Sequence, residues 1–134
     1  MRLINKELLS EVCERAKNSE RLRMNHNFHD NLTSPVQRLL NALQPGTNVP
    51  IHRHQQTAET YIILQGRIKV LFYNDSQNIE EVITLDVSTN NFGVHIPAGQ
   101  WHTIEVLTPD SVIFEVKDGP YFPIKEEDIL FLNK

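Results

Sequence analysis

Short runs of alternating apolar and polar residues dominate the chain from Val36 onward. The runs are separated by Pro, Gly and Asn, and they fall at residues 36–44, 47–53, 59–65, 67–73, 79–86, 92–96, 102–107 and 111–117. Alternation with a period of two is typical of strands that have one buried face. Many short strands at even spacing are typical of a sandwich or barrel, so the pattern predicts an all-β domain.

The first part of the chain follows a different period. Apolar residues stand near helical spacing at Leu3, Ile4, Leu8, Val12 and Ala16, with charged residues between them. This pattern predicts an amphipathic helix over residues 3–17. Residues 18–35 are rich in Asn, Ser and Asp and have no lasting period, so we expect an irregular loop. We therefore divide one structural domain into a helix and loop (1–35) that pack on a barrel (36–134).

Two segments allow more than one interpretation. Residues 36–44 place Val36, Leu39, Leu40 and Leu43 at the spacing of a helix as well as within a strand. Residues 125–132, KEEDILFL, form either a short helix or a final edge strand after the breaks at Pro120 and Pro123. A third segment is clearer. Asn and Asp at residues 74–78 predict a hairpin turn between the runs on either side.

Composition excludes several classes of protein. The 134 residues carry a net charge of −4 without a block of like charges, so nucleic acid is not an expected partner. No apolar run is long enough to cross a bilayer, so no membrane association is expected. The N-terminus has charges where a signal peptide needs its apolar stretch. Because the lone Cys13 cannot form an internal disulfide, we expect a cytoplasmic protein.

Two histidines and a glutamate lie close together in the chain. His52 and His54 are separated by one residue, so on a strand both side chains point to the same face and Arg53 points away. Glu59 follows after a short polar turn at the start of the next run, and it can approach the same point. Arg53 is accordingly interpreted as a solvated or interface charge.

A second segment offers a fourth ligand. Pro97 and Gly99 predict a tight turn, and His102 follows as the strand resumes. Three imidazoles and one carboxylate form a mixed nitrogen and oxygen site, which suits zinc, iron, nickel or manganese. We therefore predict one divalent transition metal. His95 stands two residues before Pro97, and nothing in the pattern supports it as a ligand.

These residues resemble the motifs of the cupin superfamily. The first motif, G-x5-H-x-H-x4-E-x6-G, is matched at every fixed position between Gly46 and Gly66. The second, G-x5-P-x-G-x2-H-x3-N, is matched at its proline, second glycine and histidine, whereas Asn91 and Val106 occupy its first and last positions. The resemblance implies an RmlC-like jelly-roll barrel, the cupin double-stranded β-helix, in which residues 36–44 form a strand. It also implies that His52, His54, Glu59 and His102 bind the metal.

A narrower resemblance is to the WbuC-like cupin metalloproteins, which are associated with gene clusters for surface polysaccharides. It rests on the segments at residues 25–29, 36–43 and 114–121. That family is described by its fold and metal rather than by an agreed reaction. The resemblance implies a small carbohydrate-related or carboxylate ligand and a place in polysaccharide biosynthesis. It also raises His29 as a residue that lines the ligand pocket.

Arg38 and Asn41 lie on opposite faces of the predicted strand, so only one of them can face the cavity. We expect Arg38 to face inward, where its guanidinium would suit an anionic ligand, with an internal salt bridge as the alternative. Trp101 is expected to pack on the outer face or in an interface rather than on a ligand.

Three functions are compatible with these residues. The first is a metal-dependent enzyme, such as an isomerase or epimerase, that acts on a small ligand. The second is a non-catalytic sugar-binding or metabolite-binding cupin, or a structural zinc protein. The third is an iron-dependent dioxygenase. We also expect a homodimer, because isolated jelly rolls expose sheet edges.

Overall fold

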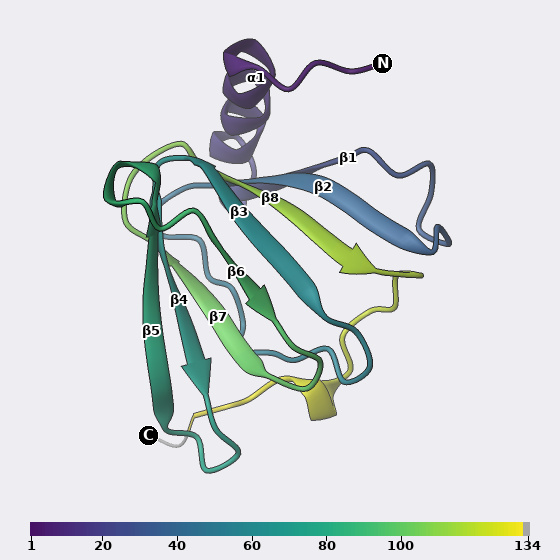
Figure 1. Cartoon of the computed structure of the whole chain (residues 1–134), viewed down its shortest axis with the longest axis vertical. Coiled ribbons are helices and arrows are strands. Elements are labelled where there is room, and N and C mark those ends of the chain that lie inside the picture. Colours follow the sequence, from purple (N-terminus) through teal and green to yellow (C-terminus); the bar gives the residue numbers. More distant parts are fainter. Residues whose placement is uncertain (133–134) are drawn as a thin grey trace.

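A computed structural model describes residues 1–132, and residues 133–134 of the predicted barrel lie outside the described part. One helix precedes eight strands in that range (Figure 1). The elements are α1 (Lys6–Lys17), β1 (Arg23–Asn27), β2 (Val36–Leu43), β3 (Glu59–Gln65), β4 (Arg67–Tyr73), β5 (Ile79–Asp86), β6 (Gly93–Ile96), β7 (Trp101–Val106) and β8 (Ser111–Asp118), with 3-10 turns η1 (Val87–Thr89) and η2 (Glu126–Asp128). No helix in residues 1–132 is long and apolar enough to cross a membrane.

The strands form two antiparallel sheets, with the orders β1-β2-β8-β3-β6 and β5-β4-β7. The chain crosses between the sheets after β3, as Figure 1 shows, and the apolar faces pack against each other. The core is made of Leu43, Tyr61, Ile63, Ile68, Val70, Phe72, Leu85, Ile96, Ile104 and Ile113. The prediction of an all-β jelly roll with a short N-terminal helix is confirmed.

The helix α1 covers the outer face of the larger sheet. Its buried residues Leu8, Val12 and Ala16 belong to a second apolar cluster with Leu40 of β2 and Val112 of β8. The predicted helix began three residues too early. The Asn5 side chain accepts a hydrogen bond from the backbone N–H of Leu8 at 3.0 Å, which starts the helix at Lys6.

The surroundings of β2 explain why its sequence also matched the spacing of a helix. Both of its faces are buried, because Leu39 and Leu43 point into the barrel while Leu40 and Ala42 point at α1. Apolar residues on both faces remove the simple alternation. The predicted orientation of Arg38 is wrong. It shares the outer face with Leu40, beyond the cover of α1, and it is exposed.

Two other predictions of secondary structure are wrong, for residues 18–35 and for residues 47–53. The expected loop at residues 18–35 contains β1, which pairs with β2 at the edge of the sheet. The expected strand at 47–53 is reduced to an isolated bridge at His52. Pro50 has no N–H to donate, and side chains take the neighbouring carbonyls: Arg23 donates to the Asn48 oxygen and Thr103 to the Val49 oxygen.

The last segment contains a short 3-10 helix, one of the two predicted alternatives, and residues 125–132 form no edge strand. It runs from the end of β8 across one end of the barrel and contains η2, followed by an isolated bridge between Ile129 and His52 (Figure 1). The backbone N–H of Leu130 donates to the Ile51 oxygen at 2.8 Å. The C-terminal segment is therefore held directly against the first motif.

Candidate metal centre

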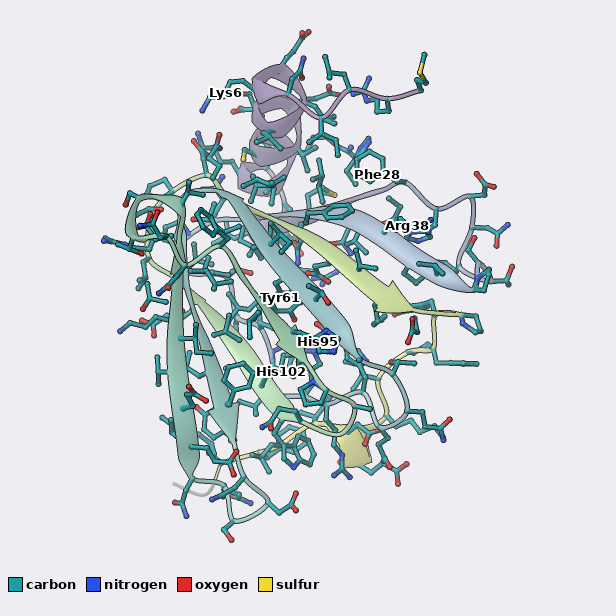
Figure 2. The ribbon with its side chains drawn as sticks, in the orientation of Figure 1. Lys6, Phe28, Arg38, Tyr61, His95 and His102 are labelled. Carbon is teal, nitrogen blue, oxygen red and sulfur yellow. The ribbon has the colours of Figure 1, made fainter. Side chains whose placement is uncertain are left out.

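The four predicted ligands converge at one point inside the barrel. Figure 2 labels His102 on the inner side of the sheets. One donor atom from each of His52, His54, Glu59 and His102 lies within 4.8 Å of every other, so the group could hold a metal ion. The Nε2 atom of His54 is 2.8 Å from Oε2 of Glu59, and Nε2 of His102 is 3.5 Å from Oε1. His102 is nearly inaccessible, while the His54 side chain keeps 17% exposure. His54 is thus the ligand nearest to solvent.

Backbone pairing brings the two motifs together. His52 and His102 exchange N–H to C=O hydrogen bonds of 3.0 and 2.9 Å, and the Gly99 N–H donates to the His54 oxygen at 2.8 Å. Gly99 has φ +85°, a conformation that favours glycine, in the turn closed by the Gln100 N–H on the Pro97 oxygen. The predicted turn therefore positions the second motif against the first.

The imidazoles are oriented as metal ligands. Nδ1 of His52 lies 2.8 Å from the Pro50 oxygen, and Nδ1 of His102 lies 2.8 Å from the Gln100 oxygen. A carbonyl oxygen only accepts, so both Nδ1 atoms carry the proton and both Nε2 atoms keep a lone pair. Nε2 of His102 is buried without a hydrogen-bond partner in residues 1–132. A metal ion would satisfy this orphaned atom, and the donor set fits a divalent transition metal.

The charges of the group also favour a cation. Burial and the neighbouring His102 lower the pKa of His52 to about 4, so the imidazole is neutral at pH 7. Burial alone would raise the pKa of Glu59, but the adjacent imidazoles of His102 and His54 outweigh it and hold that pKa well below its usual range. An ionised carboxylate beside the neutral imidazole of His52 attracts a divalent metal.

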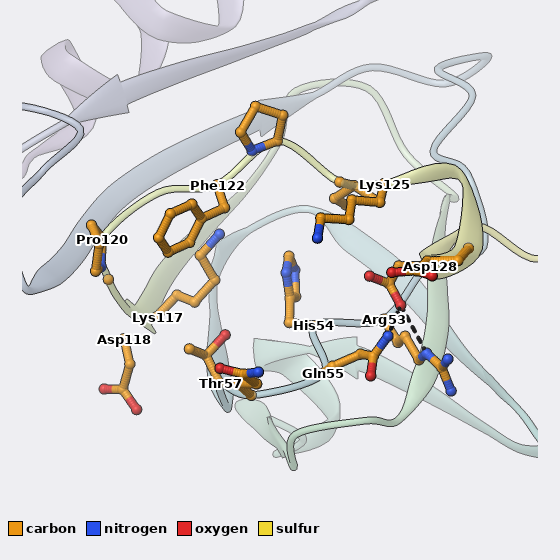
Figure 3. A pocket seen from close by; sticks show the side chains of 15 residues that line it. Arg53, His54, Gln55, Thr57, Lys117, Asp118, Pro120, Phe122, Lys125 and Asp128 are labelled. Atoms are coloured by element: carbon orange, nitrogen blue, oxygen red, sulfur yellow. Dashed lines mark hydrogen bonds and ion pairs between the residues drawn. The ribbon is translucent and has the colours of Figure 1, made fainter.

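A pocket of about 580 Å³ opens beside these ligands, and His54 lies on its wall (Figure 3). The opposite wall is the C-terminal segment, including Phe122, Lys125 and Asp128, and Lys117 of β8 also lines the space. His54 is therefore reached from solvent through a pocket that the last residues of the chain help to form.

The family comparison matches residues 4–85, more than half of the chain, to the family described as Domain of unknown function (DUF6016). The chain belongs to this family. None of the curated proteins matches it.

The fold of this DUF6016 member is shared with solved cupin structures. A cupin superfamily protein from Desulfitobacterium hafniense has a TM-score of 0.56 at 18% identity, covering 72% of this chain and 76% of that one. The TT1209 protein from Thermus thermophilus reaches 0.63 at 19% identity, covering 88% and 97%. KdgF from Halomonas sp. reaches 0.57 at 16% identity, covering 72% and 79%. The comparison shows that the chain shares the fold of these structures.

The two predicted ligand-binding residues lie away from the pocket. Arg38 is on the outer face of β2, and neither Arg38 nor His29 is among the residues that line the pocket. Nδ1 of His29 instead accepts a hydrogen bond from the Arg38 backbone N–H at 3.1 Å. His29 therefore continues the edge pairing of β1. His95, as expected, is no part of the cluster, and its Nδ1 pairs with the Thr60 hydroxyl on the outside of β3.

The sequence indicated a solvated or interface charge at Arg53, whereas the structure places Arg53 in an ion pair within the chain. It points away from the metal ligands, but its Nε donates to Oδ1 of Asp128 at 3.1 Å. Its guanidinium carbon lies 4.3 Å from the centroid of the Trp101 ring, and the Trp101 Nε1–H donates to Asp75 at 2.9 Å. Arg53 thus joins the segment of His52 and His54 to the residue before His102.

Sequence reasoning missed a polar group inside the barrel. Glu115 of β8 lies directly opposite Tyr61 of β3, and Nδ2 of Asn41 donates to its Oε1 at 2.9 Å. Burial, followed by the charge of Glu59, raises the pKa of Glu115 to about 7. Burial and both carboxylates raise the pKa of Tyr61 well above its usual range. The spacing of two from Ile113 to Glu115 to Lys117 was the available sign that these charges face inward.

Proposed function

We propose that this protein binds one divalent transition metal through His52, His54, Glu59 and His102 and uses it to bind a small carbohydrate-related or carboxylate ligand. The observation that carries the proposal is the buried, partnerless Nε2 of His102 among three other donors, beside an open pocket. Zinc, iron, nickel and manganese are all compatible with this donor set.

The metal would act as a Lewis acid on a carbonyl or hydroxyl oxygen of the bound ligand. The protein residues bind the ligand and orient it. His54 lies on the pocket wall, so a ligand that enters the pocket reaches the metal from that side. Glu115 and Tyr61 provide ionisable groups on the inner face of the same sheet as Glu59. An isomerase or epimerase needs such groups to move a proton, which favours these reactions over oxygen chemistry.

A carbohydrate-related ligand is supported by the sequence resemblance to WbuC-like cupins. That resemblance covers residues 25–29, 36–43 and 114–121, and it connects the protein with surface-polysaccharide biosynthesis. The last of these segments runs from β8 into the pocket wall. Phe122 follows it, lines the pocket and is 72% exposed, so it provides an apolar surface for the carbon face of a ligand.

We also propose a cytoplasmic homodimer. Cys13 is free and buried, and burial raises its pKa to about 11, which suits a reducing compartment as well as an inert core position. Ile62, Leu64 and Phe92 are exposed apolar side chains on and beside β3, and a second copy would cover them. Light scattering coupled to gel filtration checks this, and a monomer at micromolar concentration would refute the dimer.

The central test is elemental analysis of protein purified without added metal or a metal-chelating resin. We expect about one equivalent of metal per chain in the wild type and in His95→Ala, whose imidazole lies outside the cluster. The His102→Ala variant should stay folded and lose the metal, because it deletes a ligand. Absence of metal in the wild type, even after reconstitution with Zn²⁺, Fe²⁺, Ni²⁺ and Mn²⁺, would refute the proposal.

A further inference from the structure

Two lysines from different parts of the chain line the pocket together with His54. Lys117 of β8 is the register partner of Glu59 of β3, so the two side chains leave the sheet on the same face. Lys125 stands immediately before η2 in the C-terminal segment. Both residues line the pocket, and Figure 3 shows both ammonium ends turned toward the space around His54.

Neither ammonium group is held in a close ion pair, although Lys117 interacts electrostatically with Glu115, and Lys125 with Asp128, at longer range. Among residues 1–132, no carboxylate oxygen lies within 4.0 Å of either Nζ, and neither Nζ donates a hydrogen bond to a protein acceptor. The Tyr121 ring lies beside Lys117, with its centroid 5.5 Å from Nζ. The two lysines thus differ from Arg53, the third cation of the pocket, which is held by Asp128.

Three acidic residues, Asp118, Glu127 and Asp128, also line the pocket, and none of them has a carboxylate oxygen within 4.0 Å of either Nζ. Asp128 is committed to Arg53 and also accepts from Gln55 at 2.6 Å. The Asp118 side chain points away from His54 in Figure 3. A partly enclosed pocket with uncommitted ammonium groups raises the local concentration of anions. The metal would add further positive charge, because its two charges exceed the one negative charge of its ligands.

We propose that the ammonium groups of Lys117 and Lys125 form an anion subsite for the carboxylate or phosphate group of a small ligand whose other oxygen group binds the metal. The inference rests on the proposed metal function and narrows its ligand to molecules with two oxygen groups, at least one of them anionic. Hydroxy acids, sugar acids and sugar phosphates belong to this class, whereas neutral sugars do not.

The first experiment uses the protein loaded with Co²⁺, whose visible spectrum reports ligands that reach the metal. Succinate provides a second carboxylate for the lysines, and acetate does not. We expect the double variant Lys117→Gln/Lys125→Gln to bind succinate about tenfold more weakly than the wild type, the loss typical of a hydrogen bond to a charged group. Acetate and Co²⁺ affinities should not fall in that variant.

Lys69→Gln is the matched control. It removes one positive charge from β4, at a residue that does not line the pocket, and should bind succinate like the wild type. Equal succinate affinity in the wild type and the double variant would overturn the subsite. An equal loss for succinate and acetate would also overturn it, because the lysines would then act on the metal rather than on the second anionic group.

A second experiment separates the subsite from the metal. Phosphorus NMR of inorganic phosphate, and carbon NMR of labelled acetate, measure anion binding to the metal-free protein at low ionic strength. We expect phosphate or acetate to bind the wild type and Lys69→Gln and to lose about tenfold in affinity in the double variant. Tighter phosphate binding assigns a phosphate ligand, and tighter acetate binding assigns a carboxylate. Failure of Co²⁺ to bind the wild type would refute the proposed metal function. The NMR experiment on the metal-free protein would still test the anion subsite by itself.

Discussion

Replacing Glu115 with glutamine should stabilise the metal-free protein at alkaline pH and leave it nearly unchanged in acid. The carboxyl of Glu115 is desolvated and close to the negative charge of Glu59, which raises its pKa from an ordinary 4.5 to about 7. The folded protein therefore keeps a proton that the unfolded chain has already released between these two pH values. Stability falls as the pH rises through this window, and the whole cost is present above pH 7.

The size of the effect follows from the width of that window. Each pH unit between the unfolded and folded pKa corresponds to about 1.4 kcal/mol, so the ionised Glu115 costs roughly 3 kcal/mol above pH 7. Glutamine keeps an oxygen that accepts from Nδ2 of Asn41 and carries no charge. The Glu115→Gln variant should therefore exceed the wild type by about 2–3 kcal/mol at pH 8.5 and by less than about 1 kcal/mol at pH 5.

The assay is urea unfolding of both proteins at pH 5 and pH 8.5 in the presence of a chelator. The chelator is needed because a metal beside Glu59 would itself favour the ionised form of Glu115. Glu105→Gln on the exposed side of β7 is the matched control, and it should change stability little at either pH. A stability difference between Glu115→Gln and wild type that is the same at both pH values would refute this account of the buried carboxyl.

Three further outcomes are expected. At a Zn²⁺ concentration of 100 times the dissociation constant, the wild type should gain about 2.7 kcal/mol in unfolding free energy, and His102→Ala should gain nothing; equal gains in calorimetry would place the metal elsewhere. Asp128→Asn should weaken metal binding about tenfold by releasing Arg53 from its position between two ligands, and an unchanged affinity in a competition titration would show that the Arg53 contacts do not position the ligands. Asn5→Ala should cost about 1 kcal/mol, because the Leu8 N–H loses its cap; a change below ~0.3 kcal/mol in urea unfolding would show that the cap is not made in solution.

The barrel could be predicted from the sequence because most of its strands bury one face. An alternation of apolar and polar residues then follows directly from the geometry of a strand, as in β4 and β7. The edge strand β1 escaped this reasoning. Its sequence, RMNHN, is polar because neither of its faces lies in the main core. It forms a strand because β2 provides the backbone groups with which it pairs. No local sequence pattern predicts a strand of this kind.

The candidate metal ligands could be predicted for a related reason. His52 and His54 occupy alternate positions, and the turn before His102 needs a glycine with positive φ, so short-range geometry already constrains three of the four donors. The expected strand around His52 was wrong, and the residues converge all the same. The backbone pairing of His52 with His102 across the two motifs holds His52 in place without the strand that was expected at residues 47–53.

What the sequence by itself determined is therefore the class of fold and the set of candidate metal ligands, since both depend on side-chain periods and turns within a few residues of each other. The tertiary structure decided which charges face the pocket. Arg38 lies outside and Lys117 faces the pocket, and this depends on which face of each strand meets the helix and which meets the second sheet. It also decided the environment of Glu115, because desolvation and the charge of Glu59 come from strands far away in the chain. Burial is a property of the assembled barrel, so it cannot be predicted from a short run of residues.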